Sequence, residues 1–126
     1  MPDNQMEVLL VEDDDSLRLV LSAALAQTGY KVRTAADGVF ALIEIASRMP
    51  DLLVSDLDMP RMSGYELLSM VRREFPPIPL IAMSGELWQK IPAGADAFYQ
   101  KGTHPLFLIQ LVTAMTHRFV VPEQSA

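Results

Sequence analysis

The chain has 126 residues, half of them hydrophobic and 21% charged, which is the composition of a globular domain. Its formal net charge is −6, whereas nucleic-acid-binding proteins usually carry an excess of basic residues. The absence of cysteine excludes disulfides and thiolate metal sites. Residues 1–7 lack the features of a signal peptide, and no apolar run has the length of a membrane span. We therefore expect a single cytoplasmic domain over 1–126 that binds neither nucleic acid nor membrane.

The first part of the chain alternates short apolar runs with stretches of helical periodicity. Residues 8–11 form an apolar run typical of a strand buried on both faces. Apolar residues then recur at helical spacing over 17–25, and Gly29 is placed to end that helix. Residues 30–34 alternate as a short strand does, and Asp37 is a candidate N-cap for a second helix.

The rest of the chain continues this alternation. Ser63 and Glu66 fit a capping box, which predicts the start of a third helix. The predicted elements are a strand at 52–56, a helix at about 64–74, strands at 79–83 and 97–100, a last helix at about 105–118 and a tail at 120–126. Five strands alternating with helices predict an α/β fold, a three-layer sandwich with helices on both faces of a parallel sheet.

Polar side chains follow four of these strands. The first strand ends on Glu12 and Asp13, the third on Asp56, the fourth on Ser84 and the fifth on Lys101. With strand order 2-1-3-4-5, the three carboxylates converge where the order reverses, the usual ligand position in such sheets. Two like charges about 4 Å apart repel by roughly 4 kcal/mol at an effective dielectric constant near 20. A hard divalent cation such as Mg²⁺ relieves that repulsion, so the pattern predicts a metal-dependent phosphoryl-transfer site.

Several segments carry the pattern of a known family. The run Asp-Leu-Asp-Met-Pro-Arg-Met-Ser-Gly at 56–64 is the most specific of them. Others lie at 8–14, 37–38, 83–85 and 94–98. Over about residues 6–119 the chain resembles the receiver domains of bacterial two-component response regulators, a chemotaxis-regulator-like family with a flavodoxin-like fold.

The resemblance implies a role for each residue of the acidic crevice. Asp56 is the implied phosphoacceptor, and Glu12 and Asp13 are the implied acidic pair. Asp13, Asp56 and the backbone carbonyl of Asp58 are the implied direct ligands of Mg²⁺. Such a domain is not an enzyme in the usual sense, because it assists only its own phosphorylation and dephosphorylation.

The resemblance also implies a switch and partners. Ser84 is the implied switch hydroxyl, Lys101 the phosphoryl-binding lysine and Phe98 the switch aromatic. A histidine kinase or a histidine phosphotransfer protein would donate the phosphoryl group, and an unknown downstream protein would recognise the switched surface. The last helix is apolar on more than one face, which also suggests a homodimer or partner surface there.

Three departures from the family pattern are visible, of which the replacement of the commoner acidic residue before Gly64 by Ser63 is harmless if Ser63 caps the third helix. Gly102 follows Lys101 where the family usually has proline, often after a cis bond. A cis bond before a residue other than proline costs about 2.5–4 kcal/mol, so a trans bond is expected here. The segment between Ser84 and Lys101 is also shorter than usual, which predicts a shortened fourth helix of a turn or two at 86–90. We expect residues 85–96 to be mobile and to gain order on phosphorylation.

Two other classes of protein remain open from the sequence. A haloacid-dehalogenase-like phosphatase also places Asp-x-Asp after an apolar strand, but its nucleophile strand comes first and its acidic pair last. In this chain the acidic pair precedes Asp56, and there is no room for a cap domain. The other alternative is a pseudo-receiver that binds partners without phosphorylation, for which the Lys101-Gly102 departure is the main support.

Overall fold

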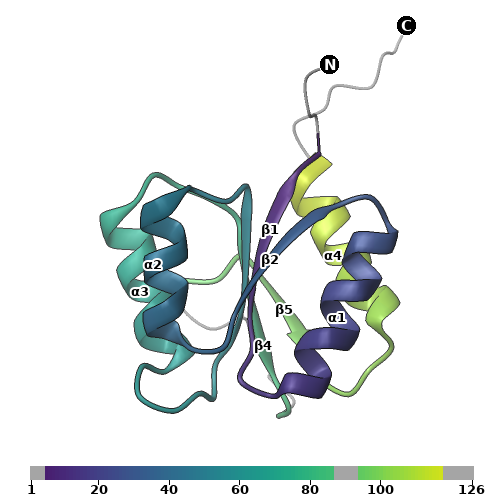
Figure 1. Ribbon diagram of the computed structural model, residues 1–126, viewed down its shortest axis with the longest axis horizontal. Coiled ribbons are helices and arrows are strands. Elements are labelled where there is room, and N and C mark those ends of the chain that lie inside the picture. The colour runs from purple at the N-terminus through teal and green to yellow at the C-terminus, as the bar shows by residue number, and fades with distance from the viewer. Residues whose placement is uncertain (1–4, 87–93, 118–126) are drawn as a thin grey trace, which may run out of the picture.

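The computed structural model describes residues 5–86 and 94–117 and shows a three-layer α/β sandwich (Figure 1). Its sheet contains five parallel strands in the order β2-β1-β3-β4-β5, as predicted. The strands are β1 (Glu7–Val11), β2 (Lys31–Ala35), β3 (Leu52–Asp56), β4 (Leu80–Ser84) and β5 (Ala97–Gln100). Their carboxyl ends lie along the lower edge of the sheet in Figure 1.

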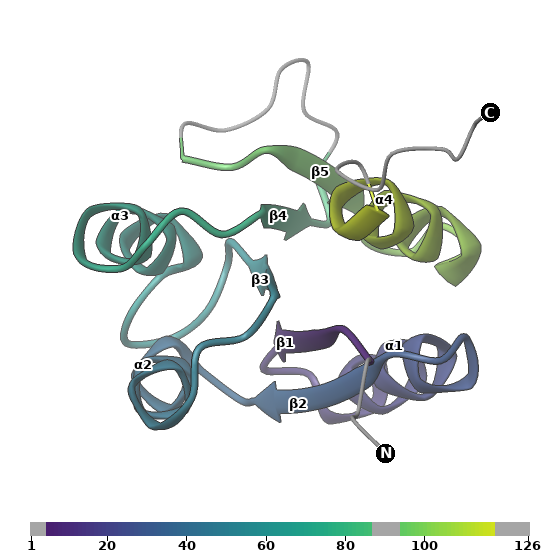
Figure 2. The ribbon, with the colours of Figure 1, turned by 90° about the horizontal axis from the view of Figure 1, so that it is seen from above.

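Four helices cover the two faces of the sheet in the described part of the chain. They are α1 (Asp15–Gln27), α2 (Gly38–Ser47), α3 (Gly64–Glu74) and α4 (Pro105–His117). α1 and α4 lie on one face, and α2 and α3 lie on the other (Figure 2). These positions match the four longer helices predicted from the sequence. No helix in the described residues is long and apolar enough to cross a bilayer.

The predicted shortened helix between Ser84 and Lys101 falls largely on residues 87–93, which lie outside the described residues. The described end of that segment is bound to the sheet. The backbone N–H of Asp96 donates to the carbonyl of Leu80 at 2.7 Å, and the Asp96 carboxylate accepts from the Leu80 N–H at 2.9 Å. The carboxylate also pairs with Arg72 of α3 at 2.9 Å. Asp96 therefore fixes the entry into β5.

Alternate side chains of each central strand pack on opposite faces of the sheet. In β1, Val8 and Leu10 belong to the core beneath α1 and α4, and Leu9 and Val11 belong to the core beneath α2 and α3. All four are fully buried. Because both faces are covered, a central strand needs apolar residues at every position, which produces the continuous apolar runs in the sequence.

Short polar caps start the helices close to the carboxyl ends of the strands. Asp14 caps α1 and accepts from the backbone N–H of Leu17 at 2.9 Å. Asp37 caps α2, and Ser63 and Glu66 form the predicted capping box of α3. Asp14 and Asp37 lie within three residues of the ends of β1 and β2, whereas Ser63 ends a longer loop, residues 57–63, after β3.

The opposite edge of the sheet holds a buried carboxylate between two arginines. Oε2 of Glu7 lies 2.7 Å from Arg48 Nη2 and 3.1 Å from Arg33 Nε, and the Glu7 N–H donates to Asp51 at 2.7 Å. Burial alone would raise the pKa of Glu7. The Arg48 hydrogen bond and the Arg33 charge outweigh burial, so the pKa lies below its ordinary value.

Candidate functional site

Three carboxylates meet at the carboxyl ends of β1 and β3. Parallel pairing of the two strands sets Val11 opposite Ser55, so the next residues, Glu12 and Asp56, lie side by side where the strands end. Asp13 follows Glu12 in the turn to α1. One carboxylate oxygen from each of the three acids lies within 4.8 Å of the others. The structure thus brings together the acids that the strand ends indicated.

Two of these acids are withdrawn from solvent. Glu12 and Asp56 are both 0% exposed, whereas Asp13 is exposed. Oε2 of Glu12 accepts from the backbone N–H of Asp14 at 2.9 Å, and Oδ1 of Asp56 accepts from the N–H of Asp58 at 3.1 Å. The other oxygen of Glu12, Oε1, is buried and accepts no hydrogen bond from the described residues. The crevice therefore has spare acceptor capacity.

Lys101 enters the same crevice from the end of β5. Its Nζ lies 3.0 Å from Oδ2 of Asp56 and 3.1 Å from Oε1 of Glu12. The contact with Glu12 Oε1 is a charge contact that lacks hydrogen-bond geometry. One ammonium group thus faces two buried carboxylates, with the exposed carboxylate of Asp13 beside them.

The turn after Lys101 differs from the usual family arrangement. The peptide bond to Gly102 is trans, and Gly102 takes φ 92°, a conformation that glycine adopts without a steric penalty. The Thr103 N–H closes the turn on the Gln100 carbonyl at 3.3 Å. A trans turn through glycine therefore carries the lysine amine to the carboxylates.

Burial and like charge raise the pKa values of both buried acids. For Asp56, burial raises the pKa, and the hydrogen bonds from Lys101 and the Asp58 N–H offset this only in part. For Glu12, burial again dominates, the Asp14 N–H opposes it, and the Asp56 charge raises the pKa further. Burial alone would lower the pKa of Lys101, but the two carboxylates raise it. The one ammonium group does not balance the carboxylates of the cluster, which therefore favours a further positive charge.

The Ser84 hydroxyl contacts the loop after β3 and not Asp56. Its Oγ donates to Oδ2 of Asp58 at 3.2 Å and accepts from the Glu86 N–H at 3.1 Å. Only the backbone carbonyl of Asp58 was expected at the site from the sequence, and this side-chain contact was not predicted. The pairing of Asp56 with Met83 places the ends of β3 and β4 side by side. The predicted strand order, which makes these two strands neighbours, was the sequence signal that could have indicated the contact.

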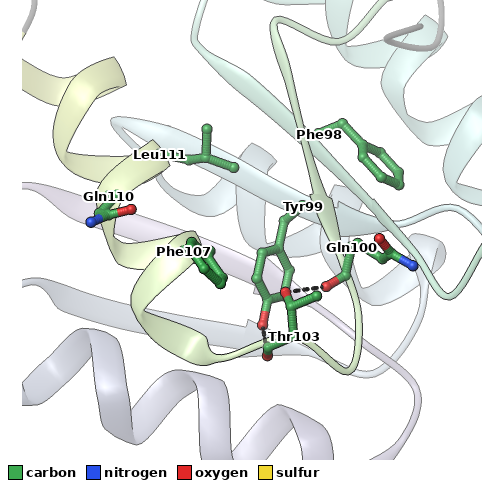
Figure 3. A pocket seen from close by; sticks show the side chains of 7 residues that line it. All are labelled: Phe98, Tyr99, Gln100, Thr103, Phe107, Gln110 and Leu111. Atoms are coloured by element: carbon green, nitrogen blue, oxygen red, sulfur yellow. Dashed lines mark hydrogen bonds between the residues drawn. The ribbon is translucent and has the colours of Figure 1, made fainter. Parts of the chain in front are cut away.

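A second hollow lies between β5 and α4 (Figure 3). It has a volume of about 410 Å³, and its lining residues are Phe98, Tyr99, Gln100, Thr103, Phe107, Gln110 and Leu111. Phe98 is half-buried and points away from Tyr99, whose hydroxyl donates to the Thr103 carbonyl at 2.7 Å. None of the acidic residues lines this hollow, so we place the chemistry in the crevice and not here.

Comparison with known proteins identifies the family. The model of the response regulator receiver domain matches residues 8–113. The response regulator MprA of Mycobacterium avium is 36% identical over 115 residues, which cover 87% of this chain and 49% of that protein. The DNA-binding transcriptional regulator NtrC of Escherichia coli is 38% identical over 93 residues, covering 74% of this chain and 19% of that protein. The chain therefore spans about half of MprA and about a fifth of NtrC.

Solved structures agree with this match. The chemotaxis response regulator CheY4 of Vibrio cholerae superposes with a TM-score of 0.83 at 28% identity, covering 89% of this chain and 99% of that one. The response regulator TrrA of Thermotoga maritima, in complex with Mg²⁺ and BeF, gives a TM-score of 0.82 at 25% identity, covering 88% and 99%. The family match leaves no support for the phosphatase alternative. The chain belongs to the family of response regulator receiver domains of two-component systems.

Proposed function

We propose that Asp56 accepts a phosphoryl group from the phosphohistidine of a histidine kinase or a histidine phosphotransfer protein. The observation that carries the proposal is the approach of Lys101 Nζ to within 3.0 Å of Asp56 Oδ2, beside the buried Glu12. The ammonium group would neutralise charge on the transferred phosphoryl oxygens. Because Lys101 reaches the site through a trans bond to Gly102, the main support for a non-phosphorylated pseudo-receiver is weakened.

The residues of the crevice fit Mg²⁺. Glu12, Asp13 and Asp56 offer carboxylate oxygens within 4.8 Å of one another, and Oε1 of Glu12 is buried without a hydrogen bond. Hard oxygen ligands in a negatively charged crevice are what Mg²⁺ prefers. Asp13, Asp56 and the backbone carbonyl of Asp58 would bind the ion directly, with Glu12 beside them. When bound, the ion would offset negative charge on the phosphoryl group.

In the proposed transfer, the phosphorus–nitrogen bond of the donor breaks as a phosphorus–oxygen bond to Asp56 forms, and the departing imidazole takes a proton from solvent. Lys101 holds the accepting carboxylate. Ser84 now donates to Asp58, so its hydroxyl must turn away from that partner to reach the new phosphoryl oxygens. By the family resemblance, Phe98 would be the aromatic side chain that turns inward with it. The switch would therefore pass from the crevice to the surface of β5.

In this proposal, residues 1–126 form one receiver domain that acts in the cytoplasm and has its core at about 6–119. The domain is a phosphoacceptor that assists only its own phosphorylation and dephosphorylation. A downstream protein of unknown identity would bind the switched surface. Leu106 and Phe107 of α4 are 49% and 54% exposed, and this surface would suit a partner or a second copy of the chain.

Incubation with acetyl phosphate and Mg²⁺, followed by intact mass measurement, tests the proposal. Wild type should gain one phosphoryl group that hydroxylamine removes, because an acyl phosphate is labile to that nucleophile. Asp56→Asn should gain none. Asp15→Asn is the matched control, because Asp15 belongs to the same acidic run in the sequence but is exposed and pairs with Arg18. Equal labelling of Asp56→Asn and wild type would reject the assignment, and an unlabelled wild type would favour the pseudo-receiver.

A further inference from the structure

The loop between β3 and α3, residues 57–63, contacts two residues of the proposed site, Asp56 and Ser84. The backbone N–H of Asp58 donates to Oδ1 of Asp56 at 3.1 Å, and the Asp58 carboxylate accepts from Ser84 Oγ at 3.2 Å. The Asp58 carbonyl is also the proposed backbone ligand of Mg²⁺. A displacement of this loop would therefore move a metal ligand and release the Ser84 hydroxyl together.

Arg61, in the middle of this loop, has an unusual backbone conformation. Its φ is 65°, and among the described residues it is the one non-glycine residue with a positive φ. A side chain disfavours this region sterically, and such residues persist where the surrounding structure over-determines them. The contacts of Arg61 should therefore reveal what holds the loop.

Those contacts lead to the start of α2. Nη2 of Arg61 lies 2.5 Å from Oδ2 of Asp37, whose side chain is only 3% exposed. Oδ1 of Asp37 accepts from the Phe40 N–H at 2.9 Å, so the carboxylate is already fixed as the N-cap of α2. The exposed guanidinium of Arg61 therefore pairs with a buried carboxylate that a second hydrogen bond already holds in place. The ion pair joins the loops that follow β2 and β3, the strands on either side of β1.

Two glycines show how closely the loop is fitted. A Cβ on Gly38 would lie 2.9 Å from three side-chain atoms of Met62, so the residue after Arg61 packs directly on the start of α2. A Cβ on Gly64 would lie 2.0 Å from the Asp56 carbonyl, so the far end of the loop is pressed against β3. The loop is thus held against β3 at one end and against α2 in its middle.

We infer that Arg61 is a positioning residue, which through its ion pair with Asp37 holds the loop in the geometry that presents Asp58 to Mg²⁺ and to Ser84. The inference rests on the proposed function for its metal, but the ion pair itself is present without one. Loss of either partner should loosen the loop, weaken Mg²⁺ binding and leave the rest of the fold intact.

Three variants separate the charge pair from the backbone conformation. Asp37→Asn keeps an N-cap of similar strength but turns an amide towards Arg61. Arg61→Ala removes the guanidinium, and Arg61→Gly removes it while also relieving the strain at positive φ. Arg73→Ala is the matched control, because Arg73 pairs with Glu74 on an exposed part of α3. If the charge pair matters, the two Arg61 variants should behave alike despite their different backbone preferences.

Calorimetric Mg²⁺ titration gives the first readout. Asp37→Asn and Arg61→Ala should each raise the Kd about fivefold, and the double variant should add little, as expected for two residues that act as a pair. Arg73→Ala should bind as wild type does. An unchanged Kd in both single variants, or full additivity in the double variant, would overturn the inference. A fall in melting temperature with an unchanged Kd would assign the pair a structural role only.

Hydrogen exchange on the metal-free protein gives the second readout. Amides of residues 57–63 should exchange faster in Asp37→Asn and Arg61→Ala than in wild type or Arg73→Ala, while β1 and β3 stay protected. If wild type binds no Mg²⁺, the proposed function fails, but faster loop exchange would still support the ion pair as the element that holds the loop. Unchanged loop exchange would overturn it.

Discussion

The two edges of the sheet both bury carboxylates, yet they balance the charge differently. At the amino edge, Glu7 faces two guanidinium groups, from Arg33 and Arg48. At the carboxyl edge, Glu12 and Asp56 share a single ammonium group. The pKa of Glu7 is lowered, because its arginines outweigh burial, whereas the pKa values of Glu12 and Asp56 are raised by burial.

This contrast separates a stabilising use of buried charge from a functional one. A carboxylate matched by arginines at the amino edge supports the folded state. The unmatched pair at the carboxyl edge makes the folded state less stable unless a cation arrives. Strong desolvation together with incomplete pairing is the usual electrostatic mark of a functional site. The same sheet thus contains its own internal control for the assignment of Asp56.

The largest expected effect on stability comes from a substitution at the amino edge, where the charges are balanced. Glu7→Gln removes the buried carboxylate from Arg33, whose side chain is only 16% exposed, and leaves it the half-exposed carboxylate of Glu44. Removing one partner of a fully buried pair costs about 3–5 kcal/mol. We expect Glu7→Gln to lower the free energy of unfolding, measured with urea, by about 3 kcal/mol or less, because Arg48 is 57% exposed and can be solvated.

Glu44→Gln is the control for that measurement. Glu44 also pairs with Arg33, at 3.0 Å, but its side chain is 40% exposed. A pair of this kind contributes about 0–1 kcal/mol. A loss as large as that of Glu7→Gln would show that burial is not what distinguishes the two acids.

A change of opposite sign is expected at the carboxyl edge. Asp13→Ala removes one of three clustered negative charges, so the metal-free protein should become more stable by about 1 kcal/mol, the low end of the range for an exposed like-charge contact. The same change should weaken Mg²⁺ binding at least tenfold or so, because it removes a proposed ligand. Urea unfolding without metal and a Mg²⁺ titration measure the two effects. A less stable metal-free variant would contradict the charge argument.

The smallest effect is a pH dependence of opposite sign at the two edges in metal-free buffer. The pKa of Glu7 is lowered, so its stabilisation is present above the ordinary value of 4.5 and is lost as pH falls further. The pKa values of Glu12 and Asp56 are raised, so their protonated forms stabilise the fold at low pH. That stabilisation is lost as pH rises from the ordinary values of 4.5 and 3.8 through the raised ones.

Difference curves isolate each edge. Wild type should lose its advantage over Glu7→Gln below about pH 4.5, and its deficit against Asp56→Asn should shrink as pH falls from neutral towards that value. Each slope should be a fraction of the roughly 1.4 kcal/mol per pH unit that one whole proton gives. If the stability of wild type and that of Asp56→Asn change in parallel with pH, the pKa of Asp56 is not raised.

Hydrophobic periodicity and the polar residues at strand ends predicted the helices, the strands and the acidic crevice, because these features depend on residues close together in the sequence. Continuous apolar runs such as that of β1 require a sheet covered on both faces, and parallel strands bring their carboxyl ends to one edge. The contact of Ser84 with Asp58 and the pair of Arg61 with Asp37 were missed. Both depend on how the loop after β3 folds, and a positive φ at an arginine has no signature in a hydrophobic pattern.

The most direct test of the central claim compares Mg²⁺ binding when each edge is altered. Wild type and Glu7→Gln should bind Mg²⁺ with the same Kd in calorimetry, once the folded fraction of the variant is measured. Asp56→Asn should lose most of that affinity, because the cation is bound by the unbalanced edge alone. Undiminished binding by Asp56→Asn, or an equal loss in Glu7→Gln, would contradict the assignment of the carboxyl edge as the functional site.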